Sequence, residues 1–528
     1  MVWTSPYEPV PTEGTVLDDI AAAGDEAALV DGPSGVVTTY AARAAGIERA
    51  AAGLAARGVR EGDVVGIWAP NVPAWAPIAL GAMAAGAAVT GVAPAATERE
   101  LRAQLLDARA RVLAAAAPVD GGGCDVVALD ELLAPAGPLP PPALDSRAVA
   151  LLPYSSGTTG LPKGVMLTHA NLAVAVRQIR GALKLTARDT VVAVAPFAHV
   201  MGFVVSLAAP LSAGATVVTM PRFALEPYLA LVERHRATVL VVPPPIMNAL
   251  AREPAVAAHD LSSVELVVSG GAPLGADVQR AVAERLPGVV TRQGWGLTET
   301  AAIATSPDRE RPIAPGSVGR AMPSTELRVV DPHSGADLGA GEPGELWLRG
   351  PQVMAGYLGR PDATAAMIDA DGWLRTGDVG VIDDDGQIFI VDRLKELIKV
   401  SAHQVAPAEL EALLATHPAV ADVAVVPRPD PDRGEVPVAV VVPASRVDAE
   451  ALMAWVAERV APYKRVRAVR FVDALPRTPS GKLLRRLIVA ADEAMAVGGP
   501  AAGDDRLVIE MGGGAARGAG GAGAHATR

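Results

Sequence analysis

One segment near residue 160 combines residue types that bind a polyphosphate. It reads Tyr154-Ser-Ser-Gly-Thr-Thr-Gly-Leu-Pro-Lys163-Gly164. Its glycines free the backbone to turn and to aim N–H groups at an anion, the hydroxyls add donors, and Lys163 adds a positive charge. The spacing is not the Walker pattern, in which Ser or Thr follows the lysine. The segment predicts a phosphate-binding loop rather than a plain surface turn, with these candidate ligands: Ser155, Ser156, Gly157, Thr158, Thr159, Gly160 and Lys163.

Two carboxylates and one lysine farther along the chain stand in motifs that suit the same chemistry. Glu299 ends Gln293-Gly-Trp-Gly-Leu-Thr-Glu299 and is a hard oxygen ligand for Mg²⁺, the alternative being a solvated carboxylate. Asp378 ends Thr376-Gly-Asp378, and an acceptor-only carboxylate suits sugar hydroxyls, although the tripeptide also suits a turn. Lys482 ends Pro479-Ser-Gly-Lys482, a loop that can enter a site and neutralise developing charge; a solvated lysine is the alternative.

The order and separation of these motifs resemble those of a known superfamily. Two further motifs belong to the same series, Asp392-Arg-Leu-Lys-Glu-Leu-Ile-Lys399 and Gln404-Val-Ala-Pro-Ala-Glu409. From about Thr38 to Ile488 the chain resembles the adenylate-forming superfamily of acyl-CoA synthetases, luciferases and peptide-synthetase adenylation domains. The sequences of the motifs are most similar to those of bacterial 4-coumarate or cinnamate CoA ligases. The resemblance implies a ligase that uses ATP to adenylate a small carboxylic acid, releases pyrophosphate and transfers the acyl group to CoA.

The resemblance also implies roles for individual residues of the nucleotide site. Glu299 would hold Mg²⁺, Thr298 would contact phosphate, and the ring of Trp295 would lie against adenine. Asp378 would bind both ribose hydroxyls, and Arg393 would also reach the ribose. The remaining members of the predicted nucleotide site are Gln293, Gly294 and Gly296.

A second group of implied roles belongs to a mobile C-terminal domain. Lys482 matches the adenylation lysine of the superfamily, while Lys399 and Gln404 match residues near the reaction centre when the small domain closes. Lys395 matches the hinge about which that domain swings. A catalytically dead scaffold would have lost Lys482, Glu299 or Asp378, and this chain retains all three.

The predicted acid pocket is built from three segments. In relatives these are the residues after Ala195-Pro196, those from Ser269 to Ala272, and those after Glu299. His199 matches the pocket histidine, with a satisfied core histidine as the alternative, and Met201 stands where coumarate-type enzymes carry Tyr. Small residues at Gly270, Gly271 and Ala272 leave room for a flat ring. The sequence therefore favours an arylpropenoic or benzoic acid over a long fatty acid.

One position departs from the superfamily pattern and leaves two acceptors open. The family places glycine where this chain has Ala402, between Ser401 and His403. Glycine lets the pantetheine arm of CoA pass close to the backbone. Either the tunnel through which the pantetheine arm reaches the active site tolerates the methyl group of Ala402, or the enzyme does not use CoA. In the second case it is an ATP-dependent diazotase that adenylates nitrite and transfers it to an aminoaryl acid.

The elements that must position these residues follow an alternating pattern. Short apolar runs alternate with Ala-rich amphipathic stretches, which indicates parallel sheets covered by helices. We expect strands at Val64 to Trp68, Val191 to Ala195, Thr216 to Met220, Val239 to Val242 and Leu266 to Ser269, and helices at Ala41 to Arg57 and Leu225 to His235. From about Ser317, strand-like pieces between acidic turns predict a compact β-rich subdomain.

The domain organisation follows from changes in composition. The fold class is α/β: a large N-terminal domain of stacked mixed α/β sheets with the β-rich subdomain (1–391), a hinge (392–395), and a small mobile α+β domain (396–497). A helix is expected at Pro407 to Thr416, strands at Val420 to Val426 and Val436 to Val442, and a helix at Ala449 to Val460. Residues 498–528 are mostly Gly and Ala with scattered charges and predict a disordered tail.

Composition excludes several classes of function. At 528 residues the chain exceeds a single core, and a net charge of -12 argues against nucleic-acid binding. Cys124 is the single cysteine, so no intramolecular disulfide can form. No signal peptide and no membrane span is expected, which favours a cytoplasmic enzyme acting on small molecules; the oligomeric state stays open.

Overall fold

A computed structural model describes residues 1–20, 24–134, 144–155, 162–401, 403–477 and 483–497. The chain divides into two compact units, Met1–Leu397 and a second unit that begins at Ile398. The division falls just after the segment for which a hinge was predicted, residues 392–395. The hinge role of this segment and the disorder of the tail stay predictions. Several predicted residues lie outside the described residues: the tail and the motif residues Ser156, Gly157, Thr158, Thr159, Gly160, Ala402 and Lys482.

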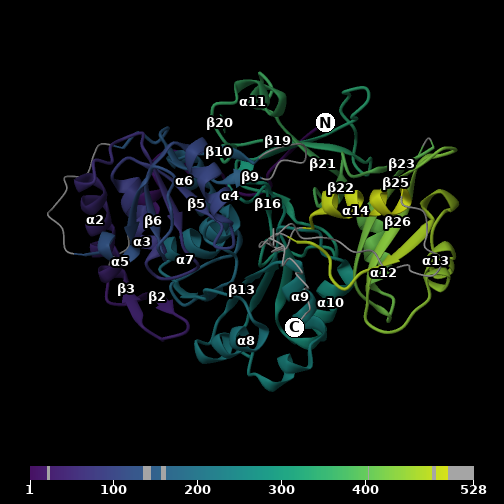
Figure 1. Cartoon of the computed structure of the whole chain (residues 1–528), viewed down its shortest axis with the longest axis horizontal. Coiled ribbons are helices and arrows are strands. Elements are labelled where there is room, and N and C mark those ends of the chain that lie inside the picture. Colours follow the sequence, from purple (N-terminus) through teal and green to yellow (C-terminus); the bar gives the residue numbers. More distant parts are fainter. Residues whose placement is uncertain (21–23, 135–143, 156–161, 402, 478–482, 498–528) are drawn as a thin grey trace, which may run out of the picture. The chain divides into compact units, whose positions relative to one another are not determined.

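Two mostly parallel sheets form the bulk of the first unit (Figure 1). The first sheet follows the order β20 (Gly356–Tyr357), β10 (Lys163–Thr168), β8 (Val149–Leu151), β5 (Ala88–Val92), β4 (Val64–Trp68), β6 (Ala110–Ala115) and β7 (Asp125–Ala128), with β9 (Tyr154–Ser155) paired to β10. The second follows β15 (Val290–Gln293), β14 (Leu266–Ser269), β13 (Val239–Val242), β11 (Thr190–Ala193), β12 (Thr216–Thr219), β2 (Ala27–Asp31) and β3 (Val37–Thr39). Antiparallel pairs involve β10 in the first sheet and β3 in the second.

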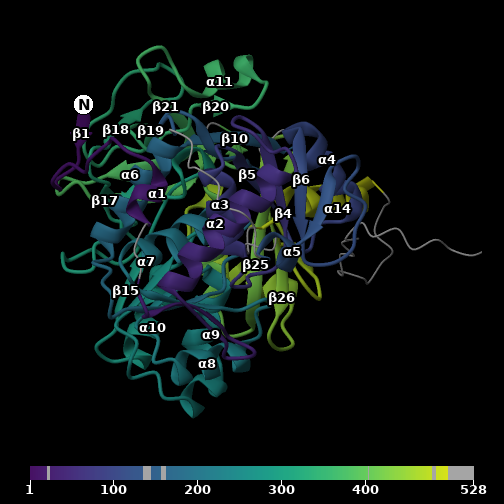
Figure 2. The same ribbon diagram turned by 90° about the vertical axis from the view of Figure 1, so that its left-hand side faces the viewer.

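Helices pack on both faces of each sheet. Successive apolar side chains of a strand point to opposite faces, which explains how one strand can contact helix layers on both sides. One apolar cluster joins the facing sides of the two sheets to α2 (Tyr40–Ala56), α3 (Trp75–Ala84) and α6 (His169–Ala182). Val191 belongs to this cluster, whereas its neighbour Val192 points into a second cluster with α8 (Leu225–Arg234), α9 (Pro244–Arg252) and α10 (Ala276–Arg285). α4 (Glu98–Ala108) covers the outer face of the first sheet. Figure 2 shows the same helices between and outside the sheets.

Shorter elements complete the first unit. An antiparallel sheet follows the order β1 (Val2–Thr4), β18 (Glu326–Val330), β19 (Gly344–Arg349), β21 (Leu374–Ile382) and β22 (Ile388–Arg393). This sheet is the β-rich subdomain, to which the N-terminal strand adds an edge that the sequence pattern did not predict. The other elements are α1 (Val16–Asp19), α5 (Leu129–Leu132), α7 (Ala209–Ser212), α11 (Pro361–Met367), β16 (Thr305–Ser306), β17 (Arg320–Ala321), a π-helix at Met201–Ala208, and 3-10 turns at Pro254–Ala258 and Thr298–Thr300.

The second unit is a small α+β domain. Its sheet follows β24 (His403–Val405), β23 (Ile398–Val400), β26 (Gly434–Pro443) and β25 (Val420–Asp430), and β27 (Ala468–Phe471) runs parallel to β26. Its helices are α12 (Pro407–Ala415), α13 (Ala449–Ala457) and α14 (Arg485–Val497), with a 3-10 turn at Pro462–Lys464. The predicted fold class is therefore confirmed. In the part of the chain that the structure describes, no helix has the length and apolarity that a membrane crossing requires.

Candidate functional site

The two ends of the predicted phosphate loop lie side by side. β9 and β10 pair antiparallel, with Ser155 opposite Lys163 and Tyr154 opposite Gly164. The hydroxyl oxygen of Ser155 is buried and has no hydrogen-bond partner among the described residues. The ammonium of Lys163 lies over the ring of Tyr357, 4.8 Å from its centroid. The short hairpin thus places an unsatisfied hydroxyl and a cation at the base of the glycine-rich segment.

A second pair of motifs, far apart in the sequence, meets at Asp378. Asp378 is 3% exposed, and its carboxylate contacts Trp295 and Arg393. The indole N–H of Trp295 donates to Oδ2 at 2.8 Å, and Nε of Arg393 lies 2.6 Å from Oδ1. Asp378 and Arg393 are register partners on β21 and β22, so the sheet itself sets their spacing. The structure therefore brings together three of the predicted nucleotide-site residues.

The part of β21 just before Asp378 is held by hydrogen bonds to β19 and within the motif. The hydroxyl of Thr376 donates to the carbonyl of Leu346 at 2.6 Å and accepts from the backbone N–H of Asp378 at 3.1 Å. The N–H of Gly377 donates to the carboxylate of Glu345 at 3.0 Å. Gly377 has φ +69°, which glycine adopts without a steric penalty. The motif Thr376-Gly-Asp378 therefore lies within β21, opposite a register shift in β19, and is not the turn that the alternative interpretation predicted. The strand fixes a buried carboxylate.

Glu299 is a second buried carboxylate, and its partner is a residue that the sequence analysis missed. The side chain is 6% exposed, and the phenol of Tyr357 donates to its Oε1 at 2.8 Å. Burial, reinforced by the charge of Glu299, raises the pKa of Tyr357 above its usual value, so the phenol remains a donor at neutral pH. No motif pointed to Tyr357, which lies on a two-residue strand; a buried tyrosine hydroxyl needs a partner, but the sequence does not say which.

The segment between β15 and Glu299 carries the remaining predicted nucleotide residues. Gln293 ends β15 and is buried, with its amide donating to the side chain of Gln279 at 3.3 Å. A Cβ on Gly296 would lie 2.3 Å from the carbonyl oxygen of Ala302, so only glycine fits there. Gly294 and Thr298 are half-buried. This segment leaves the carboxyl end of a parallel strand, the edge at which open α/β sheets bind ligands.

Members of the predicted acid pocket also converge on this edge. A Cβ on Gly270 would lie 3.5 Å from both the Sδ of Met201 and the carbonyl oxygen of Gly294, and one on Gly271 would lie 3.9 Å from the same sulfur. The half-buried His199 accepts at Nδ1 from the N–H of Met201 at 3.2 Å. Met201 begins the π-helix, a distortion that occurs often at functional sites. Ala272 is half-buried.

Asn71, which the sequence did not indicate as a site residue, holds the backbone segment that leads into this pocket. Its side-chain amide donates to the carbonyls of Ala193 and Ala195 at 3.1 and 2.9 Å, and its carbonyl accepts from the N–H of Phe197 at 2.8 Å. These three bonds hold the chain where it leaves β11 just before His199. Asn71 lies at the carboxyl edge of the first sheet, just after β4, so only the tertiary fold brings it to this place.

The remaining predicted site residues belong to the second unit. Lys399 and Gln404 are register partners across the β23–β24 hairpin, and both side chains are exposed. The tip residue Ser401 has φ +55°, a left-handed conformation that favours glycine, and its N–H donates to the carbonyl of Arg433 at 2.6 Å. The ring of His403 stacks on Tyr463, with centroids 4.2 Å apart.

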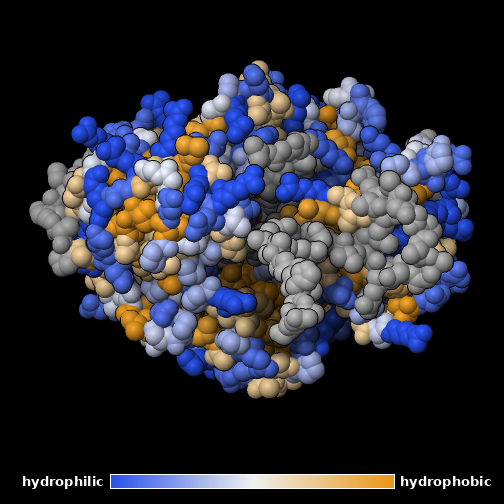
Figure 3. Space-filling model, in the orientation of Figure 1, coloured by the Kyte–Doolittle hydropathy of each residue, from blue (hydrophilic) through white to orange (hydrophobic). Residues whose placement is uncertain are grey.

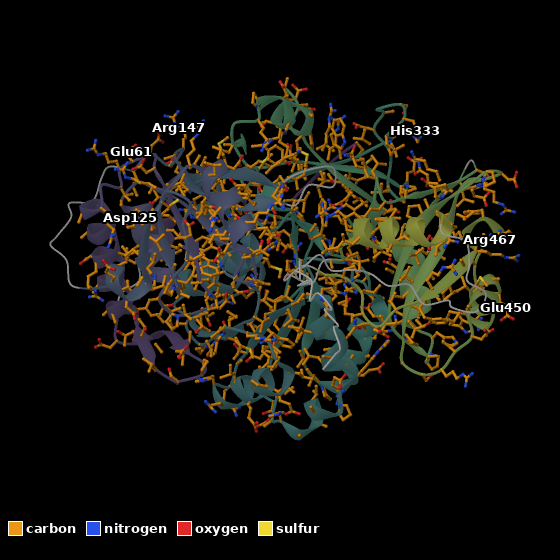
Figure 4. The ribbon with its side chains drawn as sticks, in the orientation of Figure 1. Glu61, Asp125, Arg147, His333, Glu450 and Arg467 are labelled. Atoms are coloured by element: carbon orange, nitrogen blue, oxygen red, sulfur yellow. The ribbon has the colours of Figure 1, made fainter. Side chains whose placement is uncertain are left out.

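The surface offers a contrast with these buried groups. The visible face in Figure 3 is largely hydrophilic, with smaller apolar patches. The charged residues labelled in Figure 4, such as Glu61 and Arg147, lie at the periphery and are exposed. A cavity of about 600 Å³ beside α6 is lined by Arg177, Arg180 and Lys184, none of which belongs to the predicted motifs. Since carboxylates are rarely buried unless paired, Glu299 and Asp378 identify the candidate site better than this cavity does.

Comparison with known proteins shows the family to which the chain belongs. The model of a family described as AMP-binding enzyme matches residues 18–358, and that of its C-terminal domain matches residues 409–482. The chain belongs to the AMP-binding enzyme family. The matched ranges contain the β9–β10 hairpin and Glu299 in the first unit and the α12 region in the second.

Relatives of this AMP-binding enzyme include proteins named for aromatic acids. A 4-coumarate–CoA ligase of Oryza sativa subsp. japonica is 42% identical over 505 residues, which cover 90% of this chain and 94% of the relative. The solved anthranilate CoA ligase AuaEII, in complex with anthranoyl-AMP, is 28% identical with a TM-score of 0.85 and coverage of 92% and 99%. The o-succinylbenzoate CoA synthetase of Bacillus subtilis with its acyl-adenylate is 28% identical, with a TM-score of 0.80 and coverage of 90% and 97%. The sequences of the motifs favoured bacterial coumarate-type enzymes, whereas the 4-coumarate–CoA ligase of Oryza sativa is a plant protein.

Proposed function

We propose that this protein is an ATP-dependent, AMP-forming ligase that adenylates a small aromatic carboxylic acid and transfers the acyl group to CoA. The observation that carries the proposal is the convergence of the Asp378, Glu299 and Met201 regions in the first unit of a chain that is related over nine-tenths of its length to a 4-coumarate–CoA ligase. None of these three relatives is named for nitrite, and we place the diazotase alternative among the outcomes of the test.

The nucleoside end of ATP would bind at Asp378. An ionised carboxylate only accepts hydrogen bonds, so it suits the two ribose hydroxyls. Arg393 and Trp295 hold both of its oxygens from the side, which orients it before the ligand arrives. The indole of Trp295 then offers a face for adenine, and Arg393, which is about a third exposed, can also reach the ribose.

The phosphates would bind between the β9–β10 hairpin and Glu299. Ser155 and Lys163 supply a hydroxyl and a cation at the base of the loop, and Thr298 lies beside Glu299 in the sequence. The loop residues Ser156, Gly157, Thr158, Thr159 and Gly160 complete this proposal from the sequence alone, together with Gly294 and Gly296, whose small size keeps the backbone near the ligand.

Glu299 has the chemistry of a magnesium ligand. Among the described residues no group of three or more His, Cys, Asp or Glu could hold a metal. Mg²⁺, however, is usually bound through one or two carboxylates and the phosphates of the substrate. Glu299 is buried, and among the described residues it has no basic partner, so a cation would complete its surroundings. When bound, Mg²⁺ would neutralise phosphate charge and orient the polyphosphate.

Two steps would then follow. In the first, an oxygen of the substrate carboxylate attacks the α-phosphorus, the bond to the β-phosphate oxygen breaks, and pyrophosphate leaves. Lys482 would neutralise charge that develops in this step. In the second, the sulfur of CoA attacks the acyl carbon, the bond to the phosphate oxygen breaks, and AMP leaves while the thiol proton passes to solvent. Lys399 and Gln404 would act when the second unit closes.

The acid would occupy the space beside Met201. A side chain at position 270 or 271 would come into contact with the thioether of Met201, so the two glycines leave this space open for an aryl ring. Thioether sulfur packs favourably at ring edges. His199 would stand at the entrance, where its ring is half-buried.

The test measures release of pyrophosphate and formation of AMP with coumarate, cinnamate, benzoate and aminobenzoate, each with CoA, nitrite or neither. We expect AMP formation that depends on the acid and a thioester, identified by mass, only when CoA is present. Nitrite-dependent AMP release with aminobenzoate, without any thioester, would overturn the proposal in favour of the diazotase.

A further inference from the structure

The segment from Met354 to Leu358 is tied by its backbone to both parts of the proposed phosphate site. The N–H of Met354 donates to the carbonyl of Glu299 at 2.9 Å. The N–H groups of Ala355 and Leu358 donate to the carbonyls of Met166 and Gly164 on β10, each at 2.9 Å. Tyr357 therefore lies where the strand that ends the phosphate loop passes the residue proposed to hold Mg²⁺.

The orientation of Tyr357 is set by neighbours outside the phosphate site. Its N–H donates to the hydroxyl of Thr364 at 2.9 Å, and that hydroxyl donates to the carbonyl of Arg360 at 3.0 Å. Gly356, with φ +143°, passes so close to Thr364 that a Cβ would lie 2.8 Å from its methyl carbon. Because Thr364 lies on α11, the helix fixes the tyrosine before any ligand binds.

The side chain of Tyr357 contacts two charged groups of opposite sign. Its hydroxyl donates to Oε1 of Glu299 at 2.8 Å, and its ring lies 4.8 Å from the ammonium of Lys163. The tyrosine is 5% exposed, so both contacts are largely shielded from water. Shielding strengthens a charge-assisted hydrogen bond and a cation–π contact alike.

We infer that Tyr357 is a positioning residue of the phosphate site, which orients the carboxylate of Glu299 through its hydroxyl and the ammonium of Lys163 through its ring. The inference rests on the proposed function, in which these two groups face Mg²⁺ and phosphate. A tyrosine with a purely structural role looks different in this protein. The hydroxyl of Tyr40 is bonded to two backbone carbonyls, those of Leu211 and Ala215, at 3.2 and 2.8 Å.

The experiment separates the two contacts with two substitutions. Tyr357→Phe keeps the ring and removes the hydrogen bond to Glu299. We expect it to weaken binding of MgATP, measured by calorimetry, about ten- to hundredfold, and to leave binding of ATP in EDTA unchanged. Tyr357→Leu removes both contacts and should also weaken metal-free ATP binding, by about two- to fivefold. Where Tyr357→Leu does not fold, the Tyr357→Phe comparison decides alone.

Two controls make the outcomes distinct. Tyr40→Phe removes a buried hydroxyl with the same chemistry and should lower the thermal midpoint without changing either affinity for ATP. Glu299→Gln tests the proposed function itself and should weaken MgATP binding. If Glu299→Gln weakens it and Tyr357→Phe does not, the inference is overturned while the proposed function stands. If neither changes it, both are overturned. Equal losses with and without Mg²⁺ in Tyr357→Phe, or in Tyr40→Phe, would mean a structural role only.

Discussion

Two antiparallel strand pairs of this enzyme carry residues of the proposed site, one pair for nucleotide binding and one for catalysis, and the two pairs are built in opposite ways. In the first unit, β21–β22 pairs Asp378 with Arg393, and the carboxylate is buried and bonded on both oxygens. In the second unit, β23–β24 pairs Lys399 with Gln404, both of which are exposed. In the first arrangement, neighbouring side chains hold the carboxylate in place, whereas the second presents its side chains to solvent.

The difference between the two strand pairs matches the difference between residues proposed to bind ATP and residues proposed to act in the reaction. Groups that hold ATP in its ground state gain from being fixed in advance, because the ordering entropy is then lost on folding rather than on binding. Groups that act only when a domain closes must remain free to enter and leave. Substitutions in the Asp378–Arg393 pair should therefore change affinity and stability together. Substitutions in the Lys399–Gln404 pair should change rate and leave stability unchanged.

The largest effect is expected at Lys482. Lys482→Ala should reduce adenylate formation about 10²- to 10³-fold, because the proposed role of this lysine is to stabilise charge that exists only in the transition state. ATP–pyrophosphate exchange measures the loss, and the thermal midpoint should not move. Lys464→Ala is the control, since that lysine of the second unit binds Glu409 at 2.7 Å and should not affect exchange. Exchange at near wild-type rates in Lys482→Ala would contradict the assignment.

Asp378→Ala should weaken ATP binding about ten- to hundredfold, because it removes the charged acceptor proposed for the ribose hydroxyls. It should also lower the thermal midpoint, since Trp295 and Arg393 lose their shared partner. Calorimetry and thermal unfolding test the two effects. Asp492→Ala is the matched control: this carboxylate is equally buried and accepts from Nε of Arg428 at 2.7 Å in the second unit, so it should lower stability without changing ATP affinity. An unchanged ATP affinity in Asp378→Ala would refute the ribose role.

Lys399→Ala and Gln404→Ala should slow turnover while changing the free energy of unfolding by no more than about 0.5 kcal/mol, as expected for exposed side chains. Single-turnover measurements of adenylation and of thioester formation would show which step slows. A large fall in stability would mean that these side chains are used within the domain, and the contrast between the two strand pairs would then fail.

Ala402→Gly tests the acceptor and should have a smaller effect. If CoA is the acceptor, thioester formation from a preformed adenylate should become faster or stay the same, because the methyl group is removed from the expected path of the pantetheine arm. The measurement is the rate of adenylate consumption with and without CoA. A wild-type rate that CoA does not change would contradict CoA transfer in this enzyme.

The smallest effect is expected at the C-terminus. Truncation after Gly499 removes a segment rich in Gly and Ala with few groups that could pack, so the thermal midpoint and turnover should hardly change. A clear loss of either would show that the segment docks on one of the two units.

The sequence alone determined the fold class and most of the proposed site. Strand–helix alternation is a local signal, so the strands Val64–Trp68, Val239–Val242 and Leu266–Ser269 were predicted to the residue. The motifs around Lys163, Glu299 and Asp378 could be recognised because each holds its chemistry within a few consecutive residues. Their roles followed from that chemistry and from family resemblance.

Only the tertiary structure decided which residues hold those groups in place. Tyr357 reaches Glu299 across 58 positions, Trp295 reaches Asp378 across 83, and Asn71 reaches Phe197 across 126. Tyr357 stands on a strand of two residues, too short to leave a periodic pattern in the sequence. Such partners are set by how the sheets and helices pack, and a buried hydroxyl or amide shows in the sequence only that it needs a partner, not which one.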